Sequence, residues 1–172
     1  HKKQKRYAEA GSLYLRVLTH REQELGAHHA KTLLTRYNYA LCLFKTEQNS
    51  LALEHFQRTL DGEIELYGAD DPDISMTHWN LAKCLRTLQR PAEAAVHRQR
   101  CLELEEMVED GPTIDTIQSA IAVAEDWIAA KDHQQARTVY VKATAALKEL
   151  DPSQELDDLA TALRGIAERL ES

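Results

Sequence analysis

Residues 35–43 read TRYNYALCL, and residues 77–85 read THWNLAKCL. The two segments share Thr, Asn, Ala, Cys and Leu at equal positions when the sequence is shifted by 42 residues. The same shift aligns four alanines along the chain, which are Ala10, Ala52, Ala94 and Ala136. A register held over this length predicts an internal structural repeat, in which each copy is one supersecondary unit.

Each period contains two amphipathic stretches. Apolar residues recur at intervals of three and four, first at Leu34, Tyr37, Leu41 and Phe44, and then at Leu53, Phe56, Leu60 and Ile64. This spacing predicts helices, and segments such as Asp70-Asp71-Pro72 mark the breaks between them, because Asp favours the N-cap and Pro the first turn. We therefore predict an all-α chain with helices near 5–25, 30–46, 49–67, 72–88, 91–108, 113–130, 133–149 and 153–170.

The aligned alanines have a packing role in this interpretation. Two helices joined by a short turn pack about 8–10 Å apart, and a small side chain at the crossing lets a bulky partner fit there. The predicted crossing positions are Ala40, Ala82 and Ala124 in the first helices and Ala52, Ala94 and Ala136 in the second.

The pattern Ala40, Ala52 and Phe56 resembles the tetratricopeptide repeat (TPR), and the 42-residue period with the connector YGADDPD at 67–73 is similar to that of kinesin light chains. The resemblance implies a right-handed superhelical stack of antiparallel helix pairs, a TPR-like α-solenoid with a concave side. We expect one TPR-like repeat domain over 1–172. It would comprise a partial repeat 1–29, repeats at about 30–71, 72–112 and 113–152, and a C-terminal helix 153–170.

The pattern weakens toward the C-terminus. Ala122 stands where the earlier repeats have Asn38 and Asn80, and Arg98 stands where an aromatic residue is expected. Decay of this kind is typical of a terminal or capping region.

By resemblance to the family, the face of each first helix opposite the packing alanine lines the concave surface and binds peptides. The predicted peptide-binding residues are Leu34, Tyr37, Asn38, Leu41 and Lys45 in one repeat and Met76, Trp79, Asn80, Lys83 and Arg86 in the next. The following repeat would add Gln118, Ile121, Ala122, Glu125 and Ile128.

Aromatic rings offer large contact areas, and an Asn amide can both donate to and accept from a peptide backbone. The alternative is structural: Tyr37 and Trp79 would pack between repeats, and the asparagines would make hydrogen bonds between hairpins. Arg36 and His78 stand where related repeats carry an apolar residue, and we expect both to face solvent, since such long polar side chains readily extend to water.

The charge distribution argues against nucleic-acid binding. The net charge is −7, and the four bases Lys2, Lys3, Lys5 and Arg6 form the one basic cluster, whereas a nucleic-acid footprint needs an extended basic surface. No apolar run reaches the roughly 20 residues of a membrane span, so we expect no membrane partner and a cytoplasmic location. The initial His1 in place of Met suggests a fragment of a longer protein.

No catalytic or metal site is predicted. The histidines are spread over separate helices without ligand spacing, and the cysteines (Cys42, Cys84 and Cys101) form no CxxC pair, so we expect packing thiols and no cofactor. Nucleotide-binding glycine loops and a GxSxG nucleophile motif are absent, and we expect no enzyme activity.

The sequence therefore predicts a protein-protein interaction module that holds a peptide or helix of a partner protein in a concave groove. The partner would have acidic character near Lys45, Lys83 and Arg86. The alternative is a structural or self-association module, a scaffold or sensor within a larger signalling protein, whose end hairpins pair into a homodimer.

Overall fold

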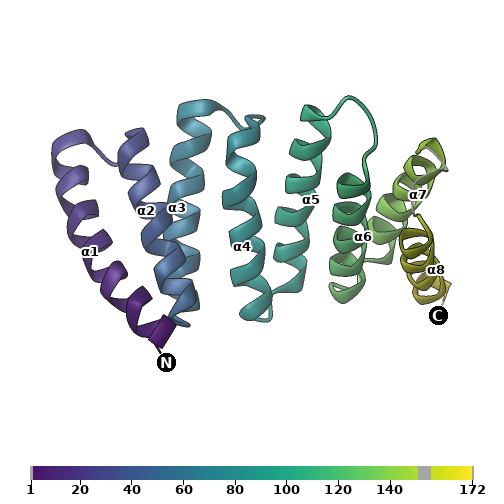
Figure 1. Cartoon of the computed structure of the whole chain (residues 1–172), viewed down its shortest axis with the longest axis horizontal. Coiled ribbons are helices and arrows are strands. Elements are labelled where there is room, and N and C mark those ends of the chain that lie inside the picture. The colour runs from purple at the N-terminus through teal and green to yellow at the C-terminus, as the bar shows by residue number, and fades with distance from the viewer. Residues whose placement is uncertain (1, 151–155, 172) are drawn as a thin grey trace. The chain divides into compact units, whose positions relative to one another are not determined.

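The computed structural model describes residues 2–150 and 156–171, and these residues form helices and turns without a strand. The helices are α1 (Lys2–Leu25), α2 (Ala30–Lys45), α3 (Asn49–Tyr67), the 3-10 turn η1 (Pro72–Ile74), α4 (Ser75–Thr87), α5 (Pro91–Val108), α6 (Ile114–Ala129), α7 (His133–Glu149) and α8 (Asp157–Glu171) (Figure 1). The all-α, TPR-like fold class is confirmed. The expected start of the last helix, at residue 153, lies outside the described residues.

The chain divides into two compact units, residues 1–89 and 90–172. The first contains α1 to α4, and the second contains α5 to α8. Because the expected repeat 72–112 spans the boundary between them, the division of 1–172 into repeats of one domain stays a prediction.

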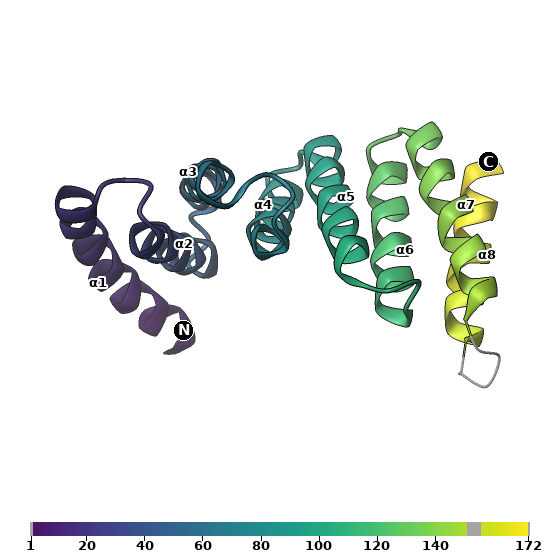
Figure 2. The same ribbon diagram turned by 90° about the horizontal axis from the view of Figure 1, so that it is seen from above.

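In the first unit, α2 packs against both α1 and α3, and α4 packs against α3 (Figure 2). Ala40 on α2 and Ala52 on α3 are completely buried, as expected of alanines at a helix crossing. A Cβ atom added to Gly62 on α3 would lie 2.5 Å from Cδ2 of Leu33 on α2, so the buried Leu33 side chain packs directly over Gly62 and would have to shift to admit a larger residue.

In the second unit, α6 packs against α5, α7 and α8. The core contains the predicted crossing residues Ala124 and Ala136, with Trp127 of α6 and Ile166 of α8 among the larger side chains. The remaining predicted crossing alanines, Ala82 and Ala94, are completely buried as well.

The turns inside the hairpins repeat with the period of the sequence. Glu47, Gln89 and Lys131, spaced by 42 residues, have positive φ angles of 65°, 58° and 62°. At Glu47 the turn is closed by hydrogen bonds from Gln48 N to Leu43 O (2.9 Å) and from Glu47 N to Phe44 O (3.1 Å). This is the left-handed helix end that usually carries glycine, here adopted by longer side chains.

The helix starts show the capping chemistry expected at the breaks. The Asp71 side chain accepts a hydrogen bond from Asp73 N at 2.9 Å, directly before Pro72. The Thr113 side chain accepts from Thr116 N at 3.1 Å, and the Thr116 hydroxyl accepts from Thr113 N at 2.9 Å, a reciprocal pair that begins α6.

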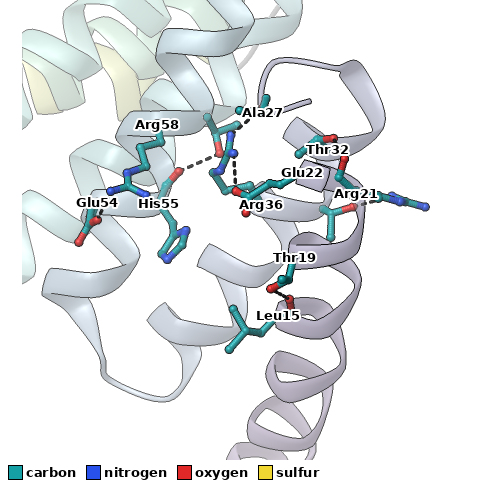
Figure 3. A network of polar contacts seen from close by, with 12 residues as sticks. Leu15, Thr19, Arg21, Glu22, Ala27, Thr32, Arg36, Glu54, His55 and Arg58 are labelled. Carbon is teal, nitrogen blue, oxygen red and sulfur yellow. Dashed lines mark hydrogen bonds and ion pairs between the residues drawn. The ribbon is translucent and has the colours of Figure 1, made fainter. Parts of the chain in front are cut away.

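Two expected surface residues are buried, and the prediction for them was wrong. Arg36 is 3% exposed and His78 is 8% exposed. The Arg36 guanidinium is accommodated because Nη2 donates to Glu22 Oε1 at 2.9 Å and Nη1 donates to the Ala27 carbonyl at 3.2 Å (Figure 3). This repeat position is therefore buried, and Arg36 occupies it while paired with Glu22.

Candidate functional site

The ten residues expected to bind a peptide lie on one face each of α2 and α4, and we call them together the α2–α4 strip. Two contacts bring the faces together. Asn80 Nδ2 on α4 donates to the Tyr37 hydroxyl on α2 at 2.8 Å, and Lys83 Nζ lies 5.4 Å from the ring centre of Phe44 on α2. The strip is therefore a continuous surface within the first unit. The residues expected from the following repeat lie on α6 of the second unit.

The strip has an exposed part and a supporting part. Leu34, Met76 and Trp79 are 60%, 58% and 39% exposed. Such exposure is costly for large apolar side chains, since each apolar residue left in water forgoes its burial free energy. Lys45 and Arg86 are exposed too, whereas the half-buried members are Tyr37, Asn38, Leu41 and Lys83.

Tyr37 contacts the fold on two sides. Its ring meets the buried Phe56 ring of α3 edge to face at 5.6 Å, and its hydroxyl accepts the hydrogen bond of Asn80. Burial raises the pKa of Tyr37, while the Asn80 hydrogen bond acts in the opposite direction. Tyr37 is thus held in one orientation, with the phenol remaining neutral.

The two repeated asparagines are not equivalent. Asn80 is 4% exposed, and its Nδ2 donates to Met76 O at 2.9 Å as well as to Tyr37. Asn38 Nδ2 donates to Leu34 O at 3.0 Å, within its own helix. Asn80 therefore makes the inter-helix hydrogen bond that the structural alternative anticipated, and Asn38 keeps more of its amide accessible.

The basic end of the strip is built around Lys83. Its Nζ lies 4.1 Å from the ring centre of Trp79, within range of a cation–π interaction. Partial burial lowers the pKa of Lys83, and the nearby charge of Lys45 lowers it further. The ammonium group therefore lies where an additional negative charge would be favourable.

At the other end of the strip, a cavity of about 410 Å³ lies among α2, α3 and α4. Its walls include Leu34, Tyr37, Tyr67 and Met76, with Glu63 of α3 inside. Glu63 Oε2 is buried and has no hydrogen-bond partner. Burial raises the pKa of Glu63, while a hydrogen bond from the Thr77 side chain lowers it.

Sequence reasoning missed Glu63, because it considered only the first helix of each hairpin. A signal was present: Glu63 follows the buried Phe56 and Leu60 at helical spacing, so a carboxylate occupies the inward stripe of α3. A charged residue at such a position requires either a partner or a function.

Other kinds of site have little support within the described residues. No group of three His, Cys, Asp or Glu side chains there is placed to hold a metal ion. All three cysteines are buried, and burial raises the pKa of the Cys84 thiol to about 12. None of the described helices combines the length and apolar character needed to cross a membrane.

The helix pairs, the buried alanines and the exposed strip define a helical-repeat protein. The chain belongs to the tetratricopeptide repeat family, whose sequence model matches residues 1–62 and 34–107. Repeats of this family are generally protein-interaction modules and typically form non-enzymatic scaffolds that bind other proteins.

Solved structures share the fold at low sequence identity. The nearly identical TPR-like repeats assigned to a kinesin light chain of Podosopora anserina superpose with a TM-score of 0.74 at 15% identity, over 99% of this chain and 89% of that one. BtubC (BKLC) from P. vanneervenii gives a TM-score of 0.69 at 19% identity, over 87% of this chain and 61% of that one. No curated protein matches the chain.

Proposed function

We propose that the α2–α4 strip binds a segment of a partner protein, either extended or helical. The observation that carries the proposal is the row of exposed apolar side chains, Leu34, Met76 and Trp79, on two adjacent helices. Apolar and aromatic side chains that gain burial at the centre of an interface supply much of its binding free energy.

The basic end gives the bound segment a direction. Lys45, Lys83 and Arg86 follow the apolar residues toward the C-terminal ends of α2 and α4. The pKa of Lys83 is already lowered by burial and by Lys45, so an acidic side chain placed there would relieve repulsion between the two ammonium groups. The bound segment therefore has an apolar part and an acidic part.

The supporting residues act by shaping the surface. In this proposal Asn80 fixes the Tyr37 phenol, and Tyr37 with Leu41 forms the floor on which the segment lies. Asn38, whose amide is more accessible, is the better candidate for hydrogen bonds to the bound backbone.

The experiment uses a displayed library of random 12-residue peptides, selected on the immobilised chain, with affinities measured by fluorescence polarisation. Leu34→Glu and Met76→Glu add a charge at exposed positions and should each weaken binding about tenfold or more. Leu51→Glu is the matched control, because Leu51 is an exposed leucine of α3 outside the strip. The proposal is rejected if Leu51→Glu loses as much peptide affinity as Leu34→Glu and Met76→Glu, or if neither of these two variants loses affinity.

A second candidate function is self-association, favoured by exposed apolar residues of α1. Leu13 and Val17, four residues apart on one side of the helix, are 61% and 42% exposed. Light scattering coupled to size-exclusion chromatography decides between the candidates: a dimer mass that Leu13→Glu converts to a monomer supports pairing, and a concentration-independent monomer mass rejects it.

A further inference from the structure

We propose that the cavity beside Glu63 is a pocket for one cationic side chain, lysine or arginine, of the bound segment, with the Glu63 carboxylate as counter-ion. This inference rests on the proposed function, because the cavity shares Leu34, Tyr37 and Met76 with the α2–α4 strip. It adds a basic residue to a segment otherwise described as apolar and acidic.

The cavity is large enough to admit a long side chain. Its volume is about 410 Å³, and the exposed residues Leu34 and Met76 are among those that line it. A water molecule takes roughly 30 Å³ of liquid volume, so the cavity holds considerably more than an isolated water. A segment lying on the strip can therefore place a long side chain inside while its backbone remains outside.

The chemistry at the bottom of the cavity calls for a hydrogen-bond donor. Glu63 Oε2 is buried without a partner, although Thr77 bonds to the same carboxyl group. A buried acceptor without a partner destabilises the folded state, and hydrogen bonds that involve a charged group are among the stronger ones. An arriving ammonium or guanidinium group would satisfy this oxygen.

The charge balance selects a cation over a neutral donor. Two acids, Glu63 and Asp73, line the cavity together with a single base, Lys31, which is itself exposed. A neutral amide or indole N–H would supply the hydrogen bond and leave the negative charge uncompensated. Burial raises the pKa of Glu63 and the nearby charge of Asp73 raises it further, so a cation placed beside the carboxyl group would favour its charged form.

The walls suit the rest of such a side chain. Lysine and arginine carry aliphatic stems that pack on apolar surface while the charged end reaches a polar group. Leu34 and Met76 offer that surface, and the aromatic residues Tyr37 and Tyr67 also line the cavity.

The experiment uses 12-residue peptide pools in which the central residue is fixed as lysine, arginine, norleucine or glutamine and the flanking positions are degenerate. Norleucine matches the lysine stem without its charge. Retention is measured on the immobilised wild-type chain, on Glu63→Gln and on the matched control Glu65→Gln, because Glu65 is an exposed glutamate of the same helix that does not line the cavity. Thermal unfolding of each variant is recorded alongside.

We expect the wild-type chain to retain the lysine and arginine pools about tenfold more strongly than the norleucine pool, in line with hydrogen bonds to charged groups. Glu63→Gln should abolish that preference, and Glu65→Gln should leave it intact. A cation preference that persists in Glu63→Gln, or equal retention of the lysine, arginine and norleucine pools by the wild-type chain, would overturn the inference.

Two outcomes separate this inference from the proposed function. If the wild-type chain retains the pools without a cation preference and Leu34→Glu does not retain them, the cation pocket is rejected and the proposed binding strip is not. Absence of retention of any pool rejects both. If Glu63→Gln unfolds, carbon-13 NMR of the wild-type Glu63 carboxyl replaces it: the lysine pool must lower the pKa of that group and the norleucine pool must not.

Discussion

Asn80 on α4 and Tyr37 on α2 are joined by a hydrogen bond of 2.8 Å, in which the Asn80 amide donates to the phenol oxygen. The same phenol ring packs on Phe56 of α3, so three helices of the first unit meet at Tyr37. A residue expected to touch a ligand thus also fixes the geometry of the surface on which the ligand would lie.

We predict that Asn80→Ala and Tyr37→Phe each lower the free energy of unfolding by about 0.5–1.5 kcal/mol. The double variant should cost less than the sum, because both changes remove the same hydrogen bond. Urea unfolding of the four proteins gives the coupling free energy. Asn38→Ala is the control, since its bond stays within α2, and additive losses for Asn80 and Tyr37 would contradict the structure.

The ion pair of Arg36 gives a second prediction. The Arg36 side chain is 4% exposed and that of Glu22 is 40% exposed. Glu22→Gln leaves the buried guanidinium without its counter-charge and should cost about 1–3 kcal/mol, below the 3–5 kcal/mol typical of fully buried pairs, because Glu22 is partly solvated. Arg36→Met removes the positive charge, so no counter-charge is needed at this position. It should therefore lower the free energy of unfolding by less than Glu22→Gln does. Denaturant unfolding compares the two, and the reverse order would show that Arg36 acts by hydrogen bonding to Ala27 alone.

The hairpin turns give a prediction of increased stability. Lys131 has a φ angle of 62°, a conformation that costs residues with a side chain about 1–2 kcal/mol. Because glycine adopts it without that cost but gains freedom in the unfolded chain, Lys131→Gly should raise the free energy of unfolding by about 0.5–1 kcal/mol. Thr138→Gly, at an exposed position inside α7, is the control and should destabilise. A lower melting temperature for Lys131→Gly would mean that packing of the Lys131 aliphatic stem contributes more to stability than its backbone conformation costs.

These cases show what the sequence could and could not predict. The 42-residue register and the capping residues located the helices, and the aligned alanines Ala40 and Ala52 are buried as predicted. Arg36 was misplaced because side-chain polarity was given more weight than repeat position, and its partner Glu22 lies on another helix. Likewise, the roles of Asn80 and Glu63 depend on contacts between helices, which a pattern within one helix does not contain.

The stability should depend on pH through His55. Burial lowers the pKa of His55 below its ordinary value of 6.5, so the unfolded chain binds the proton more readily than the folded chain. The free energy of unfolding should therefore rise with pH between the lowered folded value and 6.5, and fall as the solution is acidified through that window. His55→Phe should flatten this part of the curve, measured by thermal unfolding between about pH 5 and 7. An unchanged slope would show that His55 does not contribute.

The most direct test of the central claim compares binding and stability in Trp79→Ala, using the peptides selected on the wild-type chain. Trp79 is 39% exposed and is covered on one face by Lys83. If it is a binding residue, affinity should fall about thirtyfold, equivalent to about 2 kcal/mol, while the melting temperature changes by no more than about 2–4 °C. Leu51→Ala, the matched exposed control, should change neither. A sharp drop in melting temperature with unchanged affinity per folded molecule would contradict the proposal that Trp79 is a binding residue. Trp79 would then stabilise the packing of the repeats without contacting the bound peptide.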